Sequence, residues 1–479
     1  MARWFRLGLV GLSLLILKIA SQAQNPVFSF DPAPVTDTIP QEILVRLKSI
    51  ATRDRDENAG SGQRKSFVRE LYQLRYETLV KEFNNNEMIT AGPLLERVEA
   101  VAEKILAGNP QLSRDLILVL HRSEQPNATS YGNGVVAMML GLLARLESDD
   151  QIAFVLCHEI AHEHSVHMKK RILQLADINF DQNLNRELNS IKRSSYNRYT
   201  EARELATRIN FSLSQHSRGH ELEADSLGLL FLLNTPFNPL AALRTMEILD
   251  SVDRAKDLID QDLKKRFDFP QFPFKATWGA YTPSTTWYKK NETVDSLKTH
   301  PNCAVRREAL ARQLERLNIL VRPVNQEPYS VAWQAELEMV ESHFIGRQYG
   351  KALYQSLRLL EMQPNNAYLH AMVGKCFFRL YESQKNHQLG KVLELPHASF
   401  PAGYDKLLTF LHKLRLHEMK ALAYYYLVNQ DEALFEDEHY LYALWLVSPL
   451  EFSALDPEKI RQDYYVRYPH GRYKSELKP

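Results

Sequence analysis

The stretch that decides the fold runs from Val155 to His167 and reads VLCHEIAHEHSVH. It contains the pattern H-E-x-x-H, in which His158 and His162 lie four residues apart. Residues i and i+4 share one face of an α-helix about one turn apart, so both imidazoles can converge on a single metal ion. The preceding apolar residues 152–157, IAFVLC, predict that this helix is buried in a core.

The residue types in this pattern favour zinc. A catalytic zinc site takes three protein ligands, which can be two imidazoles and a carboxylate, and keeps one position open. Glu159 lies beside the first histidine, where its carboxylate can reach a water molecule without binding the metal itself. Because the five-residue pattern also occurs by chance on solvated helices, the interpretation needs a second motif.

That second motif is the acidic stretch Glu221–Asp225, which reads ELEAD and has the spacing E-x-x-x-D. Glu221 can supply a third ligand, while Asp225 on the same helix face can accept a hydrogen bond from the outer nitrogen of a ligand histidine. The alternative is a solvated acidic helix face. Small residues at Ala224 and Gly228 favour close helix packing around these carboxylates instead.

Together the motifs resemble the M48 family of zinc metallopeptidases, over roughly residues 65–320. The resemblance also includes His167, five residues after the second motif histidine, and a T-H-P-x-x-x-x-R element at Thr299 to Arg306. It implies a zincin-like peptidase domain with one Zn²⁺ per chain. The branch it resembles most is the exported one, in which the peptidase domain is followed by tetratricopeptide repeats.

Roles for individual residues follow from this resemblance. It implies that His158, His162 and Glu221 bind zinc, that Glu159 is the general base, and that Asp225 supports a ligand histidine. It also implies that an edge strand binds extended substrate. We place that strand at the residues Gly134, Val135 and Val136.

His300 in the T-H-P element has two possible roles by this resemblance. It either stabilises the oxyanion or occupies the open zinc position as a self-inhibiting ligand, and the alternative is a histidine that only packs at a helix start. The edge strand of the family usually reads NAFALPGG, whereas residues 127–134 here read NATSYGNG. The Pro-Gly turn is therefore lost, and substrate preference can differ.

The first 64 residues predict a leader and a linker. Residues 1–23 have two arginines, an apolar run and small residues at the end, which is typical of a secretory signal peptide cleaved after Ala23. The alternative is an uncleaved anchor helix, but the apolar run is short for that. Residues 24–64 are rich in proline and polar residues and predict a linker.

The remaining chain predicts a mainly α (α+β) architecture. The protein has only 18 glycines in 479 residues, well below the usual share of about 7%. Within the peptidase domain, 65–320, a small β-sheet is expected from 115–121 and 134–138. Residues 329–479 predict an all-α tetratricopeptide-like domain, and an ordinary helical bundle is the alternative.

Composition excludes several classes of protein. With 44% apolar and 24% charged residues the chain is globular, and 59 basic against 58 acidic residues give no basic field for nucleic acid. Three scattered cysteines cannot form a disulfide framework, although Cys157 and Cys303 both adjoin site motifs and raise the hypothesis of a redox latch. No later segment predicts a membrane span.

The resemblance to the exported M48 branch, together with the leader-like residues 1–23, implies an endopeptidase of envelope protein quality control, located in the periplasm. Its expected substrates are unfolded or misassembled proteins, because strand addition reads backbone that only such chains expose. The helical repeats are expected to bind a protein partner, with peripheral association to the outer-membrane assembly machinery. The competing hypothesis is a proteolytically silent scaffold that uses the repeats alone.

Overall fold

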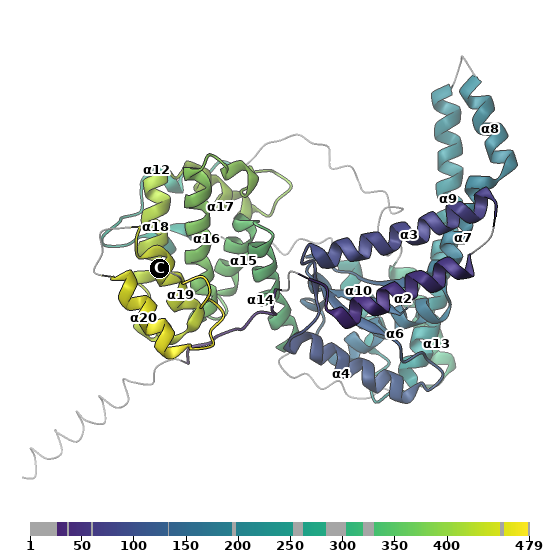
Figure 1. Ribbon diagram of the computed structural model, residues 1–479, viewed down its shortest axis with the longest axis horizontal. Coiled ribbons are helices and arrows are strands. Elements are labelled where there is room, and N and C mark those ends of the chain that lie inside the picture. The colour runs from purple at the N-terminus through teal and green to yellow at the C-terminus, as the bar shows by residue number, and fades with distance from the viewer. Residues whose placement is uncertain are drawn as a thin grey trace, which may run out of the picture. The chain divides into compact units, whose positions relative to one another are not determined.

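The structure, a computed structural model, describes most of the chain. The described residues are 26–35, 38–58, 61–132, 134–193, 198–251, 262–283, 303–319, 330–450 and 455–477. The chain divides into two compact units (Figure 1). We call them the sheet-containing unit, from Pro32–Lys256 and Trp287–Ser342, and the helical unit, from Met1–Asp31, Asp257–Thr286 and His343–Pro479. The predicted leader, residues 1–23, and His300 lie outside the described residues.

The sheet-containing unit holds a four-stranded sheet of order β1-β2-β4-β3. Its strands are β1 (Met88–Ile89), β2 (Ile117–His121), β3 (Ala128–Gly132) and β4 (Val135–Met139). Strands β2 and β4 are parallel and pair Ile117 with Val135, while β1 and β3 run antiparallel to their neighbours. The two strands that the sequence predicts are β2 and β4, so the expected small sheet is present.

The predicted position of the edge strand is wrong. Strand β4 pairs with β2 on one side and with β3 on the other, so Val135 and Val136 lie in the interior of the sheet. The two edge strands are β1 and β3, and the one beside β4 is β3, whose residues are mostly half-buried. The prediction placed the edge at β4, which is strongly apolar. Apolar residues on both faces are, however, typical of an interior strand.

Among the described residues of this unit, nine helices pack around the sheet or extend from it, and two more follow later in the chain. The first six are α2 (Gln41–Glu57), α3 (Gln63–Asn84), α4 (Pro93–Gly108), α5 (Leu140–Leu143), α6 (Asp149–His164) and α7 (His167–Phe180). The others are α8 (Gln182–Arg193), α9 (Arg198–Leu233), α10 (Ala241–Ser251), α13 (Cys303–Arg316) and α14 (Ser330–Ile345), whose last residues belong to the helical unit. Helix α6 is the central one, since every residue from Gln151 to Ala161 is buried.

Helix α2 corrects the prediction of a linker over residues 24–64. Its apolar residues Ile43, Leu47 and Ile50 recur at helical spacing, and Leu47 is buried with Leu79 and other core residues. The prolines before Pro40 and the polar run after residue 52 hid this short amphipathic pattern. The N-terminal part of the chain therefore contributes to the core of the sheet-containing unit.

The helix that carries the H-E-x-x-H pattern ends before His167. Helix α6 ends at His164, and α7 begins at His167 after Val166, which has the left-handed backbone angles φ 49° and ψ 39°. A β-branched residue rarely adopts this conformation, and Val166 offers little packing in return because it is half exposed. The break turns the chain so that His167 starts a new helix.

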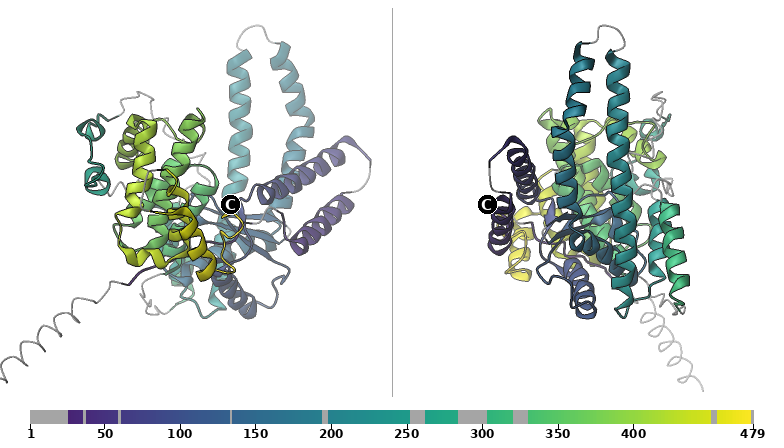
Figure 2. Two further views of the ribbon diagram at one scale, coloured as in Figure 1. Left: turned by 60° about the vertical axis from the view of Figure 1, so that its left-hand side comes forward. Right: turned by 90° about the vertical axis from the view of Figure 1, so that its right-hand side faces the viewer.

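Helix α9 carries the second motif against α6. Figure 2 shows its N-terminal half beside α8 as an extended helical pair, while its C-terminal half continues into the unit. There the helices approach closely at Gly228, where a Cβ atom would lie 3.0 Å from the backbone N and Cα of His158. The absence of a side chain at this position permits the crossing.

The helical unit is built almost entirely of helices. They are α11 (Leu263–Phe267), α12 (Ala276–Gly279), α15 (Tyr349–Leu359), α16 (Ala367–Lys385), α17 (Ala402–Lys413), α18 (Leu416–Val428), α19 (Glu438–Val447) and α20 (Pro457–Arg467), with short 3₁₀ turns at Leu389–Lys391 and Glu432–Glu436. The segment 262–283, which the sequence assigned to the peptidase domain, packs here. Its Phe267 is fully buried and stacks on Phe410 at 5.5 Å. Among the described residues of the whole chain, no helix combines the length and apolar character that a membrane span requires.

The contact at Gly228 gives a testable prediction for the fold. We expect Gly228→Ala to lower the free energy of unfolding by about 1–2 kcal/mol, because the added methyl group meets rigid helix backbone. Gly219→Ala in the same helix is the matched control, since a Cβ atom there meets nothing within 4 Å. It should raise stability by up to about 1 kcal/mol through helix propensity. Urea unfolding measures both, and equal effects would contradict the proposed crossing.

Candidate active site

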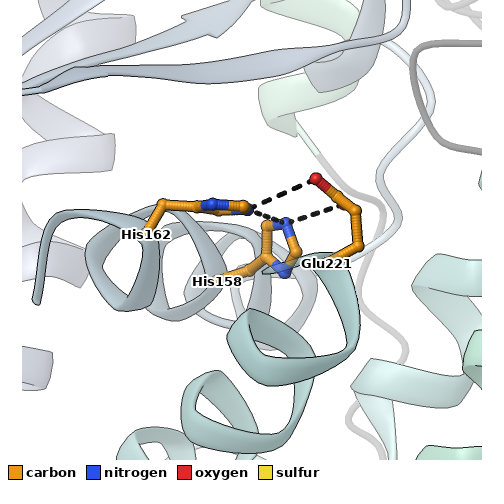
Figure 3. A group of neighbouring side chains, drawn as sticks. All are labelled: His158, His162 and Glu221. Atoms are coloured by element: carbon orange, nitrogen blue, oxygen red, sulfur yellow. Dashed lines mark hydrogen bonds and ion pairs between the residues drawn. The ribbon is translucent and has the colours of Figure 1, made fainter. Parts of the chain in front are cut away.

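Three predicted ligands converge between α6 and α9. The Nε2 atoms of His158 and His162 lie 3.1 Å apart. The carboxylate of Glu221 lies 3.6 Å from the first of these atoms and 3.5 Å from the second. Figure 3 shows the three side chains pointing toward one another. Ligand atoms that bind zinc tetrahedrally at about 2.0–2.1 Å lie roughly 3.4 Å from each other, so the observed separations fit one ion.

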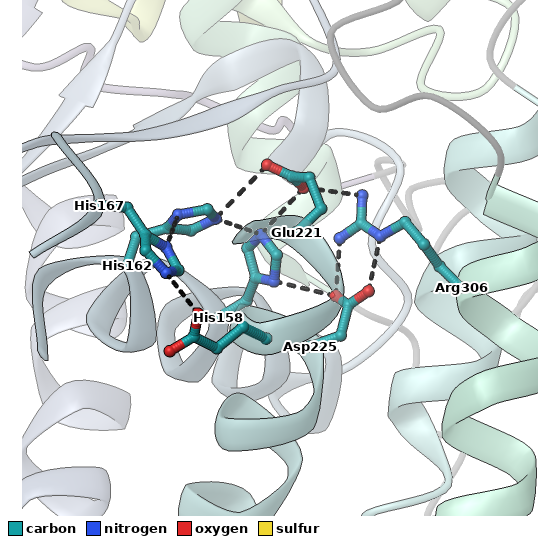
Figure 4. Close-up of polar contacts among 7 residues, drawn as sticks. His158, His162, His167, Glu221, Asp225 and Arg306 are labelled. Atoms are coloured by element: carbon teal, nitrogen blue, oxygen red, sulfur yellow. Dashed lines mark hydrogen bonds and ion pairs between the residues drawn. The ribbon is translucent and has the colours of Figure 1, made fainter. Parts of the chain in front are cut away.

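His158 is held from behind by a buried ion pair. Its Nδ1 atom lies 3.0 Å from Oδ1 of Asp225, which is only 2% exposed. Arg306 of α13 donates two hydrogen bonds to Asp225, from Nε to Oδ2 at 2.6 Å and from Nη2 to Oδ1 at 2.7 Å. Its third nitrogen, Nη1, lies 3.1 Å from Oε2 of Glu221 (Figure 4). The guanidinium of Arg306 therefore orients the ligand Glu221 directly and the ligand His158 through Asp225.

His162 has a different neighbour. Its Nδ1 atom lies 2.8 Å from Nδ1 of His167, and Nε2 of His167 lies 3.2 Å from Oε2 of Glu223. The ring of His167 also stacks on that of His220, with 4.3 Å between the centroids. The outer nitrogen of each motif histidine thus faces a polar side chain, which leaves both Nε2 atoms turned toward Glu221.

The hydrogen bonds of the two rings show that the site fits a cation. If Nδ1 of His158 donates to Asp225 and Nδ1 of His162 donates to His167, both Nε2 atoms carry lone pairs that face each other at 3.1 Å. A positive charge must lie between such lone pairs. Burial opposes protonation of His158, but the hydrogen bonds to Asp225 and Glu221 raise its pKa to about 10. The same environment that favours this proton favours a divalent metal.

Burial also tunes the other groups. Desolvation, together with the neighbouring His158, lowers the pKa of His162 to about 3, so this ring is a neutral ligand. Although burial opposes ionisation of Asp225, Arg306 and His158 hold the pKa of that carboxyl below its ordinary value. Desolvation raises the pKa of Glu159 to about 7, with repulsion from Glu221 in the same direction. A carboxyl group with that pKa can both take and return a proton near neutral pH.

Glu159 also contacts the edge of the sheet. The backbone N–H of Ser130 in β3 hydrogen-bonds to the Glu159 carboxylate. Glu163, at the end of α6, holds the end of β3 and the start of β4. It accepts hydrogen bonds from the Ser130 hydroxyl and, at 2.7 Å, from the backbone N–H of Gly134. The edge strand and the predicted catalytic carboxylate are therefore adjacent.

A second acidic and histidine cluster does not fit a metal. Glu82, Glu87 and His121 have ligand atoms close enough for one ion. However, Nδ1 of His121 accepts a hydrogen bond of 3.0 Å from the backbone N–H of Ser123. Its Nε2 atom must then carry the hydrogen in the neutral ring, and it faces Glu87 at 3.6 Å as a donor.

Comparison with known proteins agrees with this geometry. Residues 89–314 match peptidase family M48. These residues, most of which lie in the sheet-containing unit, therefore match an M48 domain that includes the candidate site. The chain is 26% identical over 201 residues to mitochondrial metalloendopeptidase OMA1 of Schizosaccharomyces pombe, which covers 39% of this chain and 53% of that protein. It is 30% identical over 120 residues to metalloendopeptidase OMA1, mitochondrial, of Bos taurus, covering 24% and 23%. The chain thus spans about half the length of the first relative and less of the second.

Within the M48 domain, the structure brings together most of the predicted site. His158, His162, Glu221 and Asp225 meet as described above, and Glu159 lies beside them. His300 is outside the described residues. Cys157 and Cys303 are both buried free thiols, and burial raises the pKa of each, so they lend no support to the hypothesis of a redox latch.

Sequence reasoning missed the role of Arg306. This residue ends the T-H-P-x-x-x-x-R element, but nothing in that spacing indicates which carboxylates it would meet, since 81 residues separate it from Asp225. The usable signal was the number of acidic groups expected in a buried site, which requires a buried cation to balance them. His167, to which the sequence analysis assigned no role, likewise contacts a ligand directly.

The buried ion pair gives a testable prediction. We expect Arg306→Ala to lower the free energy of unfolding of the metal-free protein by about 3–5 kcal/mol, because it leaves the buried Asp225 and the partly buried Glu221 without their cation. Arg312→Ala is the matched control on the same helix, where the pair with Glu308 is exposed. It should cost at most about 0.5 kcal/mol. Equal losses in urea unfolding would show that Arg306 contributes no more than a surface arginine.

Proposed function

We propose that this chain is a zinc-dependent endopeptidase that cleaves unfolded or misassembled proteins. The single observation that carries the proposal is the placement of Glu159, buried at 4% exposure beside the three convergent ligands and in contact with the edge strand. The M48 domain and the OMA1 relatives support metalloendopeptidase activity. A scaffold would have no need for a buried base at this position.

Each residue has a part in the reaction. His158, His162 and Glu221 would hold the ion, which when bound lowers the pKa of a water molecule to about 7 and polarises the scissile carbonyl. Glu159 takes the proton from the attacking water and passes it to the leaving amine. Arg306 and Asp225 keep the ligands in position while this occurs, because their hydrogen bonds are formed before substrate binds.

The edge strand favours extended substrates. Strand β3 pairs with β4 on one side, and among the described residues no strand pairs with its other side. An added chain could hydrogen-bond there through its backbone, which reads little of the side-chain sequence. Only unfolded or locally opened proteins offer such a segment, so we propose these as the substrate class.

The cellular setting is a further part of the proposal. The leader-like residues 1–23 favour an exported, periplasmic protein. The helical unit resembles the repeat domain of the exported M48 branch, which includes the β-barrel-assembly-enhancing protease of bacterial envelopes, and this favours a role in binding a partner. Ala352 and Gly374 lie at buried helix contacts, as tetratricopeptide packing requires; a Cβ atom on Gly374 would meet Leu427 at 2.5 Å. We therefore propose that this unit recruits a protein partner or client.

The decisive substitution is Glu159→Gln. We expect it to reduce cleavage of an unfolded substrate such as casein by at least 10²- to 10⁴-fold, while zinc content stays unchanged because Glu159 is not a ligand. Removal of the metal with a chelator should abolish cleavage, and added zinc should restore it. Glu103→Gln, on the exposed face of α4, is the matched control and should cleave normally.

Two results would contradict the proposal. Metal-replete protein that never cleaves an unfolded chain yet binds a partner would favour the silent scaffold. Cleavage that survives Glu159→Gln would place the activity elsewhere. A His300→Ala variant belongs in the same assay, because an enzyme inhibited by His300 gains activity on that change, whereas loss of activity indicates an oxyanion role.

A further inference from the structure

The two motif histidines are supported in unequal ways. His158 reaches a carboxylate directly, at 3.0 Å, and that carboxylate is buried. His162 reaches another imidazole, His167, at 2.8 Å, and only beyond it the carboxylate of Glu223. Metal-binding histidines usually donate their outer N–H to a carboxylate, a carbonyl or water, so the added ring needs a physical explanation.

The proton positions along this chain of contacts follow from the acceptors. Glu223 as a carboxylate can only accept, so Nε2 of His167 carries the hydrogen that faces it. In a neutral ring the Nδ1 atom of His167 is then an acceptor. Of the two Nδ1 atoms 2.8 Å apart, the one on His162 must therefore be the donor, which leaves Nε2 of His162 with its lone pair toward the metal position.

We propose that His167 is a positioning residue which, together with Glu223, fixes the tautomer and ring orientation of His162 for metal binding. The proposal rests on the zinc site of the proposed function. Glu223 on α9 does not touch His162. It acts on this ligand through His167, which donates a hydrogen bond to Glu223 and accepts one from His162.

The local structure holds His167 in place for this task. Its side chain is 4% exposed and stacks on His220 with an interplanar angle of 14°. It is the first residue of α7, directly after the left-handed Val166. That conformation costs about 1–2 kcal/mol for a residue with a Cβ atom, and it turns the chain so that residue 167 lies beside His162 (Figure 4).

The two supports also differ in exposure. The side chain of Glu223 is 46% exposed and lies 4.0 Å from Lys170, whereas that of Asp225 is 2% exposed and bonded to Arg306. Solvent and Lys170 weaken the acceptor strength of Glu223. The hydrogen bonds that support His162 are therefore weaker than those that support His158. Substitutions of His167 or Glu223 should weaken metal binding without unfolding the α6–α9 core.

The test compares two substitutions of the same residue in the full chain. His167→Phe keeps a flat ring that can stack on His220 but removes both hydrogen bonds. His167→Gln loses the ring but keeps an amide oxygen to accept from His162 and an N–H to donate to Glu223. His164→Phe, at an exposed histidine three residues earlier, is the matched control. Zinc affinity is measured by chelator competition, and the cobalt-substituted proteins give an absorption spectrum.

We expect His167→Phe to weaken zinc binding by 10- to 100-fold and to alter the cobalt spectrum, while His167→Gln stays within a few-fold of the original protein and His164→Phe is unchanged. A purely structural role predicts the reverse order, with Phe tolerated and Gln not, and would overturn the proposal. Equal zinc affinity for all variants would also overturn it.

A second pair of variants keeps the proposal testable if His167→Phe fails to fold. Glu223→Ala removes the final acceptor on an exposed side chain and should weaken zinc binding several-fold, whereas Glu223→Gln retains an acceptor oxygen and should not. Identical affinities for these two would contradict the proposal. If the original protein itself binds no zinc, the proposed function fails first, and this inference fails with it.

Discussion

The close crossing of α6 and α9 is the constraint on which the site depends. At Gly228 the backbone of one helix lies directly against the backbone of the other at His158. This approach brings a ligand pair from α6 within reach of Glu221, which lies about two turns before Gly228 on α9. A larger residue would separate the helices, and the ligand distances of 3.1–3.6 Å would not be maintained.

The crossing creates an electrostatic problem that Arg306 addresses. Two carboxylates of α9 are withdrawn from water beside two imidazoles, and a buried charge is costly unless it is paired. Arg306 brings a permanent positive charge from α13 and spreads it over Asp225 and Glu221 through a rigid donor fork. A metal ion would supply the remaining positive charge. The site is therefore prepared for a cation by its hydrogen bonds as well as by its ligand atoms.

The sequence predicts the parts of this arrangement that depend on helical spacing. His158 and His162, like Glu221 and Asp225, share a helix face because i and i+4 always do, whatever the fold. The contacts of Arg306 and His167 depend on how separate helices pack, and no local pattern encodes that. The break at Val166 was equally hidden, since a β-branched residue gives no sign of a left-handed turn.

The sheet and the N-terminus illustrate the same limit. Strand β4 is the more apolar strand, and apolar character indicates burial but not order in the sheet, so the edge position was assigned to β4 instead of β3. Helix α2 was obscured by its polar neighbours, although Ile43 and Leu47 had helical spacing. Helix α2 is placed by core residues farther along the chain, such as Leu79, whereas the order of the strands depends on pairing that apolar character does not encode.

X-ray absorption at the zinc edge of the metal-loaded protein tests the central claim most directly. The account predicts one zinc per chain, bound by two imidazole nitrogens and carboxylate oxygen at about 2.0–2.2 Å, with the imidazole contribution reduced in a His162→Ala variant. A sulfur neighbour at about 2.3 Å, which would implicate Cys157, or a zinc environment unchanged by His162→Ala, would contradict it.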